Sequence, residues 1–539
     1  MEMTRDGVAR VLLRLLSVAL LCVVFWRAGM GVRIDRIRTS SNSVSNEFLP
    51  IDEVVALVAE HVSATGSVAY VVEDVQKLDG LDRAAFAAVA FRILPRRLSL
   101  VDNNCEVLHA DYVLIDNYSA ERNRLVGCQT GYVEIERTRS TTLFAKNFRP
   151  AERRLETNDD VGVWMVVRQF AAAAMLVVLV CALFLRLSTV RIRLDAGQWV
   201  VFISVAVVLA AGCLLTHTLR SPNGTAVYAG KAKLLYLAGC LPDDFFVHDD
   251  WRVFLPVYPI GLTILTLIYY FIVGGCDNWV VQLLAFAGVL ATSLLVFGSF
   301  RTRVGCLLAL LFLVSVGTKQ IAAGFYPEGF VAASILAAMI RLRSGRGDIV
   351  AWGMAGLAAV FKNEGLVLYA MLYFVLRMCG MRNLCRPFCV IVGFVPAVAW
   401  FVLARMLGGS LDGYALNGIH ELVLHLWIAL KEVLSCMARD WKGGIVMIPI
   451  FVAGDVVARV FMRQKAKGFL KVVTLLVLIS LIGLPIVYCF CSTFQIRWRI
   501  HSSCFRLLWT TAALSLYGMS MMEHRFLALL RSRKCALRT

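Results

Sequence analysis

Long apolar runs separated by short polar segments dominate the chain. Runs of about twenty nearly uncharged residues, long enough for a helix to cross a bilayer, occur at 11–32, 161–187, 199–219, 253–274, 280–297, 390–407 and 470–490. With the weaker runs added, the pattern predicts roughly ten to thirteen transmembrane helices. The expected fold is therefore an α-helical polytopic membrane protein.

Residues 35–158 follow a different pattern. Helix-like segments ("IDEVVALVAEHV" and "LDRAAFAAVAFRI") alternate with strand-like segments ("SVAYVVE", "RRLSLVD" and "DYVLIDNY"), and a hairpin is expected around Gly127–Glu134. This pattern predicts a small α/β domain. Because it lies between two spans, we expect it outside the cytoplasm, where it would bind an acceptor or a partner.

The same patterning divides the whole chain into five parts. They are a signal anchor with a cytoplasmic N-terminus (1–34), the α/β domain (35–158), a second span with a cytoplasmic loop (159–197), a membrane domain (198–525) that contains an outer loop (217–252), and a basic cytoplasmic tail (526–539).

Composition and charge agree with a membrane protein. Of the 539 residues, 59% are hydrophobic and 17% charged, and the mean hydropathy is +0.72, well above that of soluble domains. The net charge of +18 comes mostly from Lys and Arg in short loops beside apolar runs. Basic residues in such loops set the orientation of a protein in the membrane, so the charge indicates topology rather than nucleic-acid binding. The clusters "RLRSGRG", "RMCGMRNLCR" and "MRQKAKGFLK" are expected inside, which predicts a multi-pass protein of the plasma (inner) membrane.

The number of crossings between the outer loop and Phe325 is left open. Three apolar runs (254–274, 280–297 and 304–317) lie between them, and an odd number of crossings would put Phe325 inside. Either one run does not cross, or Arg301 and Arg303 mark an unusual turn.

The cysteines predict neither a disulfide scaffold nor a metal site. Most of the 16 cysteines lie inside apolar runs, where a thiol behaves as a small hydrophobe. Only Cys105 and Cys128 share a polar region, and they could pair in an oxidising compartment. The cofactor stays unknown, with a divalent cation as one option.

A charged interruption stands out in "AAVFKNEGLVLYA", where Lys362 and Glu364 break an apolar run. The preceding leg, Ile349–Phe361, would extend roughly 20 Å as a helix, short of the roughly 30 Å hydrocarbon core. Basic clusters flank both legs, so a two-legged hairpin with the charges at its tip fits better than one span. The charges either cap a helix turn or line a substrate path.

The outer loop is the second candidate site. "TAVYAGKAKLLYLAG", with Lys231 and Lys233 among apolar residues, is typical of a helix at the membrane surface. It is followed by Asp243, Asp244, His248, Asp249 and Asp250. These carboxylates are either solvated loop charges, a cation site, or a source of a general base.

Five segments follow one another in a fixed order within 198–515: "YAGKAKLLYLAG", "HDDWRVFLPVYPIG", "FYPEGFVAASILAAMIRL", "WGMAGLAAVFKNEGLVLYAML" and "WRIHSSCFRLLWTTAAL". Their order resembles the GT-C superfamily of multispanning glycosyltransferases, related to protein O-mannosyltransferases and aminoarabinose transferases. The resemblance implies transfer of a sugar from a polyprenyl-phosphate-linked donor to a lipid, glycan or protein acceptor on the outer face. No nucleic acid is expected as a partner.

The resemblance also implies roles for particular residues. An outer-loop acid activates the acceptor, and a second acid near a later span is matched by Glu328. Where these proteins have an aspartate before the amphipathic helix, this chain has Asn223-Gly224-Thr225, so the base would be Asp249 or Asp250. The expected residues for the lipid phosphate or donor, which needs cationic partners, are Lys231, Lys362, Glu364, Arg499 and Arg506.

Two other readings remain. A transporter or flippase of a lipid-linked substrate would also place charges within the membrane, although the sequence shows no internal repeat. An inactive GT-C-like scaffold would explain the missing aspartate.

Overall fold

The computed structural model describes most of the helical part of the chain and the strands that precede it. The described residues are 58, 67–72, 97–102, 112–116, 132–137, 141–146, 163–190, 196–215, 224–241, 245–246, 258–276, 280–407, 419–439, 444–461, 468–489 and 493–536. The predicted signal anchor lies outside them.

Five strands form one mixed sheet in the order β2-β1-β3-β5-β4. They are β1 (Ser67–Val72), β2 (Arg97–Asp102), β3 (Tyr112–Asp116), β4 (Tyr132–Arg137) and β5 (Thr141–Lys146). β2, β1 and β3 run parallel, whereas β5 pairs antiparallel with both β3 and β4. The three strands expected from alternating apolar residues are therefore present.

The predicted hairpin position is wrong, because Tyr132–Glu134 already belongs to strand β4. The hairpin joins β4 to β5 across residues 138–140, where the polar sequence "TRS" separates two alternating runs. The glycine at position 127, a residue common in turns, suggested a hairpin turn nearer the N-terminus. Of the helices expected beside the sheet, only the helical residue Val58 lies within the described residues, so the structure does not show an α/β domain.

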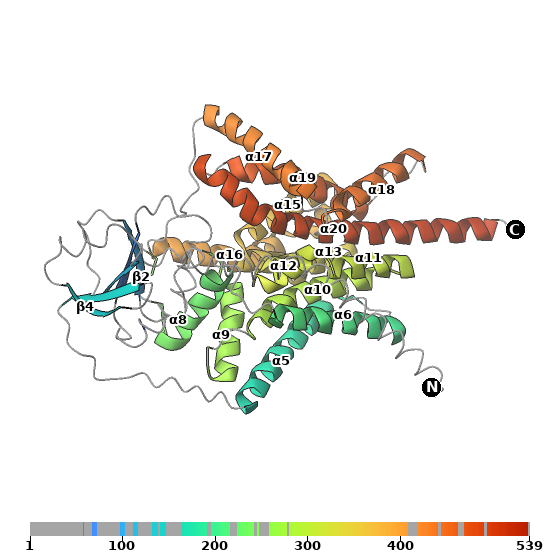
Figure 1. Cartoon of the computed structure of the whole chain (residues 1–539). Coiled ribbons are helices and arrows are strands. Elements are labelled where there is room, and N and C mark those ends of the chain that lie inside the picture. The colour runs from blue at the N-terminus through green and yellow to red at the C-terminus, as the bar shows by residue number, and fades with distance from the viewer. Residues whose placement is uncertain are drawn as a thin grey trace.

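The rest of the described chain is almost entirely helical. The first group is α5 (Val163–Ser188), α6 (Ala196–Leu215), the π-helix η1 (Thr225–Gly230), α8 (Lys231–Ala238), α9 (Gly261–Val273), α10 (Gln282–Ser299), α11 (Arg303–Leu313), α12 (Val316–Ala323) and α13 (Glu328–Arg343). The second is α14 (Ile349–Phe361), α15 (Asn363–Met378), the 3-10 turn η3 (Arg382–Leu384), α16 (Pro387–Met406), α17 (Ile419–Arg439), α18 (Met447–Phe461), α19 (Phe469–Cys489) and α20 (Thr493–Ala536). The axes of several helices, among them α11, α16 and α20, lie roughly parallel to one another (Figure 1).

Helices α10, α13, α14 and α16 pack side by side in this order, and small residues allow them to pack closely. Gly356 of α14 faces Gly393 of α16, and a Cβ atom on Gly356 would overlap the Gly393 carbonyl oxygen. Gly329 of α13 lies against the main chain of Gly288 and Val289 on α10. Backbones that approach this closely gain van der Waals contact over their whole length, as in membrane helix pairs.

Two described helices, Arg168–Ser188 and Gln282–Ser299, are long and apolar enough to cross a membrane, and up to four spans result if each of two bent pairs counts as one. The ten to thirteen spans expected from sequence are not shown, because several apolar runs fold as shorter helices such as the 13-residue α9. Large apolar side chains nevertheless face outward, for example Val178 on α5, 68% exposed, and Phe374 on α15, 62% exposed. Outward apolar faces combined with a packed interior are consistent with a lipid surrounding.

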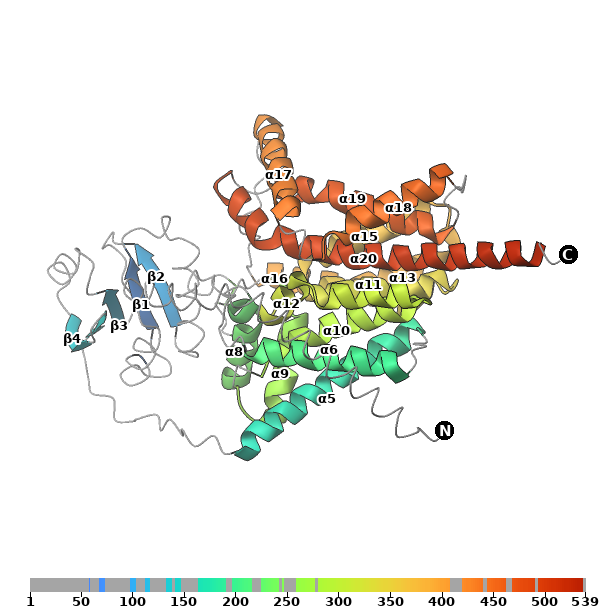
Figure 2. The same ribbon diagram turned by 45° about the vertical axis from the view of Figure 1, so that its right-hand side comes forward.

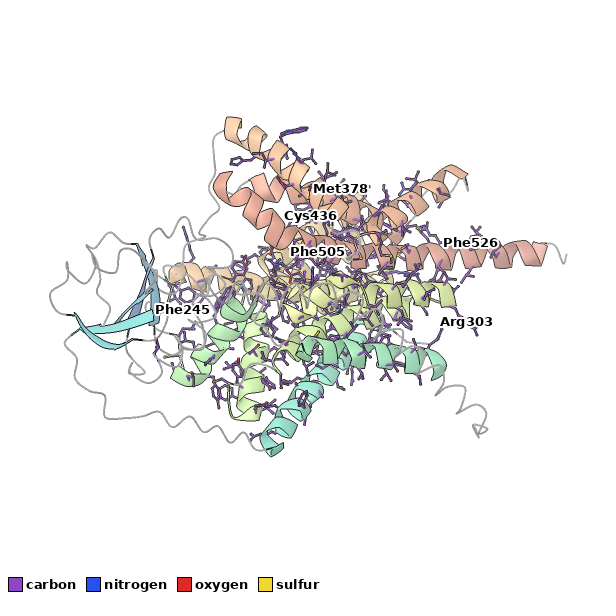
Figure 3. All side chains as sticks on the ribbon, in the orientation of Figure 1. Phe245, Arg303, Met378, Cys436, Phe505 and Phe526 are labelled. Atoms are coloured by element: carbon purple, nitrogen blue, oxygen red, sulfur yellow. The ribbon has the colours of Figure 1, made fainter. Side chains whose placement is uncertain are left out.

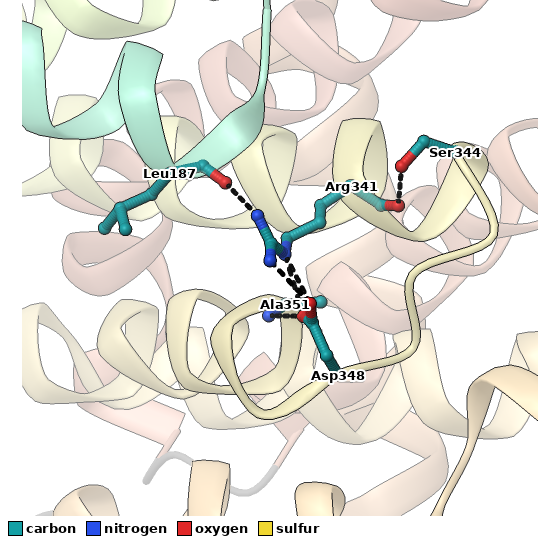
Figure 4. A network of polar contacts seen from close by, with 5 residues as sticks. All are labelled: Leu187, Arg341, Ser344, Asp348 and Ala351. Carbon is teal, nitrogen blue, oxygen red and sulfur yellow. Dashed lines mark hydrogen bonds and ion pairs between the residues drawn. The ribbon is translucent and has the colours of Figure 1, made fainter.

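One end of the bundle is marked by the Arg341–Asp348 ion pair (Figure 4). The Arg341 Nε atom donates to Asp348 Oδ1 at 2.8 Å and Nη1 donates to the Leu187 carbonyl at 3.0 Å, which joins the ends of α5, α13 and α14. The guanidinium of Arg341 lowers the pKa of the Asp348 carboxyl. We call this the Arg341 end, and the opposite end, where α13 begins at Glu328, the Glu328 end.

The path of helix α9 through the bundle bears on the number of crossings left open by the sequence. Its first residue, Gly261, lies against Phe361, the last residue of α14. At its last turn the Ile272 carbonyl accepts two hydrogen bonds from Arg168, which lies on α5 far from Leu187. Both ends of α9 therefore lie at the Glu328 end, and Figure 1 shows α9 crosswise to the long helices. This run does not traverse the bundle, which leaves α10 and the bent pair α11 and α12 as the two traverses.

Candidate functional site

Four charged side chains meet at the Glu328 end. The Lys362 Nζ atom lies 2.9 Å from Glu328 Oε1 and 3.1 Å from Glu364 Oε1. Arg506 Nη1 lies 3.3 Å from the same Glu328 oxygen. Glu328 is 0% exposed and Lys362 2% exposed. We call these four residues the Glu328 centre.

A break between two helices positions Lys362. The residue is extended (φ −158, ψ 144) between the end of α14 and the start of α15. The rings of Tyr369 and Tyr373 on α15 both contact Trp352 on α14, at centroid distances of 5.4 and 6.1 Å. The two helices therefore fold back on each other, and the predicted two-legged hairpin with Lys362 and Glu364 at its tip is confirmed as a pair of helices.

Aromatic packing brings this tip to Glu328. Phe361, immediately before Lys362, stacks on Phe330 of α13 with centroids 4.3 Å apart. Thr292 of α10 donates to the Gly329 carbonyl at 2.7 Å, which fixes the start of α13. Because Phe330 and Glu328 share the first turn of α13, the Phe361–Phe330 stack places Lys362 beside the carboxylate.

Arg506 reaches the centre from α20, a helix distant in sequence. Its guanidinium lies 4.1 Å from the ring centroid of Tyr326, a cation–π contact that gains strength when water is excluded. Tyr326 precedes Glu328 by two residues, so one short segment contacts the guanidinium with both an aromatic face and a carboxylate.

The centre also holds hydrogen-bond acceptors that are buried and unused. Glu328 Oε2, Glu364 Oε2 and Asn363 Oδ1 have no hydrogen-bond partner among the described residues. Buried polar atoms are normally paired, and those without a partner in a native structure often belong to functional sites. With two carboxylates and two cations, the centre has no net formal charge.

Lys231, the first residue of α8, lies nearby but is directed inward. It is 1% exposed, and its Nζ atom donates to the Tyr258 carbonyl at 2.9 Å. Burial lowers the pKa of the Lys231 ammonium from 10.5 to about 7. A helix is present where the sequence predicts one at the membrane surface, but this lysine is packed inside the protein rather than facing a membrane surface. Burial, and then the negative charge of Glu328, raise the pKa of the Tyr228 phenol on η1.

Of the eight predicted site residues, the structure brings Glu328, Lys362, Glu364 and Arg506 together and places Lys231 in the adjacent layer. Asp249 and Asp250 lie outside the described residues, as does Asn223. Arg499 belongs to α20, but its side chain is outside the described part. Within that part no group of three or more His, Cys, Asp or Glu could hold a metal ion.

Sequence reasoning missed the tyrosines around the centre. Tyr258 reads as an ordinary interfacial anchor, whereas in the structure its carbonyl accepts a hydrogen bond from the buried Lys231 at 2.9 Å. Tyr326 carries no signal of its own in the sequence. The phenols could be found only after the fold had joined η1, the segment before α9 and α20.

Figure 3 shows all described side chains on the ribbon, with Phe505, the neighbour of Arg506, within the densely packed middle of the helices. Comparisons with known proteins add no relative. No protein-family model, curated protein or solved structure matches the chain.

Proposed function

We propose that the protein is a membrane glycosyltransferase that moves a sugar from a polyprenyl-phosphate-linked donor to an extracytoplasmic acceptor. The observation that carries the proposal is the buried Glu328 centre, in which Lys362 and Arg506 converge on one carboxylate. Charged groups away from water are costly and are usually retained for function. The resemblance of the segments around these residues to GT-C enzymes supplies the reaction class.

The reaction needs what the centre contains. An acceptor oxygen attacks the anomeric carbon of the sugar, the bond between that carbon and the phosphate oxygen breaks, and its electron pair leaves with the phosphate. Arg506 and Lys362 stabilise the negative charge on the leaving phosphate, since cationic donors suit phosphate oxygens. The acceptor proton passes to a carboxylate, Asp249 or Asp250 in the outer loop, with Glu328 assisting and Glu364 holding Lys362 in place.

Charge distribution supports an orientation for this reaction. Arg341, Arg343 and Arg346 lie at the Arg341 end, and basic residues near short loops mark the cytoplasmic side. The Glu328 centre would then open toward the extracytoplasmic side of the plasma membrane, where the acceptor is expected. Figure 2 shows α8 and α9 gathered at the end of the bundle opposite the C-terminus.

A transporter or flippase of a lipid-linked substrate is the alternative. Buried charges on broken helices are also found along transport pathways, and the break at Lys362 is of that kind. An inactive scaffold is the third reading, motivated by Asn223 in place of the expected aspartate.

The experiment is transfer of radiolabelled sugar from membrane polyprenyl-phosphate donors to endogenous acceptors. We expect Glu328→Gln and Lys362→Ala to lower transfer about 100-fold or more, as loss of a charge-stabilising group does in other enzymes. The matched control is Asp455→Asn, which alters a buried carboxylate that binds Arg459 at 2.6 Å on α18, outside the centre. Each variant is checked for folding by its elution from size exclusion.

The outcomes separate the three readings. Transfer retained in the control and lost in the two variants supports the enzyme. Absence of transfer in the wild type, with substrate translocation across liposomes instead, supports the transporter. Neither activity, over several carriers, supports the scaffold.

A further inference from the structure

A buried lysine next to the Glu328 centre has no role in the transfer described above. Lys231 is the first residue of α8, directly after the π-helical turn η1 that carries Tyr228. It is 1% exposed, although lysine is almost never fully buried unless it is paired. Such a position calls for a partner that repays the loss of water.

The partner that the described residues show is the main chain at Tyr258. Lys231 Nζ donates to the Tyr258 carbonyl at 2.9 Å, which is an ordinary hydrogen-bond length. Tyr258 is followed by Pro259 and Ile260, and α9 begins at Gly261. The bond therefore ties the start of α8 to the segment that enters α9.

The segment that Lys231 holds packs against the centre. Gly261, three residues after Tyr258, lies so close to the end of α14 that a Cβ atom there would meet the Val360 carbonyl oxygen at 2.8 Å and the Phe361 ring at 2.9 Å. Phe361 immediately precedes Lys362, whose Nζ atom lies 2.9 Å from Glu328 Oε1. A shift of the Tyr258 main chain would thus alter the surroundings of Lys362 without a change in Lys362 or Glu328 themselves.

We propose that Lys231 is a positioning residue for the Glu328 centre: its amine holds the Tyr258 carbonyl and thereby keeps the segment that enters α9 packed against Phe361, the residue before Lys362. This inference rests on the proposed function, because it assigns Lys231 to phosphate binding at that centre. It replaces the expectation that Lys231 itself contacts the lipid phosphate.

Protonation gives the proposal a distinctive readout. Burial lowers the pKa of Lys231 to about 7, and among the described helices next to it, η1, α8 and α9 contain no Asp or Glu. The titratable groups on these helices are Tyr228 on η1, Lys233 and Tyr236 on α8, and Tyr269 and Tyr270 on α9. The ammonium makes a charge-assisted bond to the carbonyl, which is about twice as strong as a neutral one, so the bond weakens as pH rises through about 7.

The first test is binding of farnesyl phosphate to the detergent-solubilised full chain between pH 6 and pH 9. As pH rises over this range, we expect the affinity of the wild type to fall about 5-fold relative to that of Lys231→Arg. The reason is that the lysine loses its charge, whereas the arginine of the variant stays charged. The phosphate of the ligand also titrates in this range, but it does so equally for both proteins, so the ratio of their two affinities does not contain this effect. Lys231→Met should bind weakly at every pH, and the control Lys233→Met should follow the wild type.

The second test needs no ligand. Hydrogen–deuterium exchange in the peptide 258–268 should be faster in Lys231→Met than in the wild type at the same pH, and unchanged in Lys231→Arg. Equal exchange in Lys231→Met and the wild type, or equal pH profiles of wild type and Lys231→Arg in binding, would overturn the inference. If the wild type binds no polyprenyl phosphate at any pH while exchange responds as expected, the proposed function fails and Lys231 only holds the Tyr258 main chain.

Discussion

Single charges at the Glu328 centre depend on one another. One ammonium, that of Lys362, bridges two carboxylates at 2.9 and 3.1 Å, and a guanidinium shares the inner carboxylate. Removal of one member of a buried pair leaves an uncompensated charge, whereas removal of both leaves none. The centre should therefore respond to substitution as a unit.

A double-mutant cycle on Glu328 and Lys362 tests this dependence. We expect Glu328→Gln and Lys362→Met each to destabilise the protein by about 3–5 kcal/mol, as breaking buried pairs does, and the double variant to lose clearly less than the sum. The measurement is the free energy of unfolding in detergent by chemical denaturation. Additive losses would show that the two side chains do not interact.

A second residue-scale prediction concerns Lys231 and pH. Its pKa is about 7 in the folded protein and 10.5 when unfolded, so between these values the unfolded chain binds more protons. Stability must then rise with pH over this window, by about 2 kcal/mol from pH 7 to pH 8.5 at 1.36 kcal/mol per unit. In Lys231→Met this contribution should be absent. If the unfolding free energy of the wild type changed with pH in the same way as that of Lys231→Met, the lowered pKa of Lys231 would be contradicted.

Helices and their connections show where sequence reasoning succeeds. The hairpin of α14 and α15 could be predicted because each leg is too short to cross a bilayer and a charged tripeptide separates them. The failure of α9 to traverse the bundle could not, since its composition is as apolar as that of a span. Its direction is fixed by contacts with Phe361 and Arg168, which come from elements distant in sequence.

The candidate site divides in the same way. Glu328 and Lys362 could be picked out individually because charges are rare in apolar runs, and their order supported the family resemblance. Their pairing at 2.9 Å across 34 residues depends on the Phe330–Phe361 stack, which no local pattern encodes. The role of Lys231 required the fold as well, since its partner is a main-chain carbonyl.

The contact between α14 and α16 gives a prediction at this scale. A methyl group on Gly356 would overlap the Gly393 carbonyl, so Gly356→Ala should separate the helices and lower the unfolding midpoint by several degrees or abolish folding. Gly353→Ala is the matched control on the same helix, because a Cβ atom there meets nothing within 4 Å and alanine favours helix. Thermal unfolding in detergent compares them, and equal midpoints would show that the two backbones lie further apart.

The molecule as a whole has two chemically different ends. The Arg341 end carries arginines beside short turns, and the α10–α11 turn there is held by Glu523 of α20, which accepts from the main-chain nitrogens of Arg301 and Thr302 at 2.8 Å. The Glu328 end carries a charge-balanced centre and the crosswise helices α8 and α9. The proposed transfer on one face of a membrane would require such an asymmetry.

Labelling of cysteines in intact cells tests this orientation. Cys240, exposed directly after α8, should react with a membrane-impermeant maleimide added outside. Cysteine introduced by Ser344→Cys in the exposed turn after α13 should react only after permeabilisation, because basic residues beside short loops predict a cytoplasmic location for this end. Peptide mass spectrometry identifies each modified site, so the other cysteines need not be removed.

The same experiment distinguishes the path of α9. Cys276 follows α9 and is half-buried, and because both ends of α9 lie at the Glu328 end, its labelling should follow Cys240 in sidedness, though more slowly. If α9 crossed the membrane instead, Cys276 would behave like the cysteine introduced at position 344 and would react with the maleimide only after permeabilisation. That result would overturn the two-traverse path through α10 and the bent pair α11 and α12, and would place Glu328 and Lys362 on the cytoplasmic side, where an extracytoplasmic acceptor could not reach them.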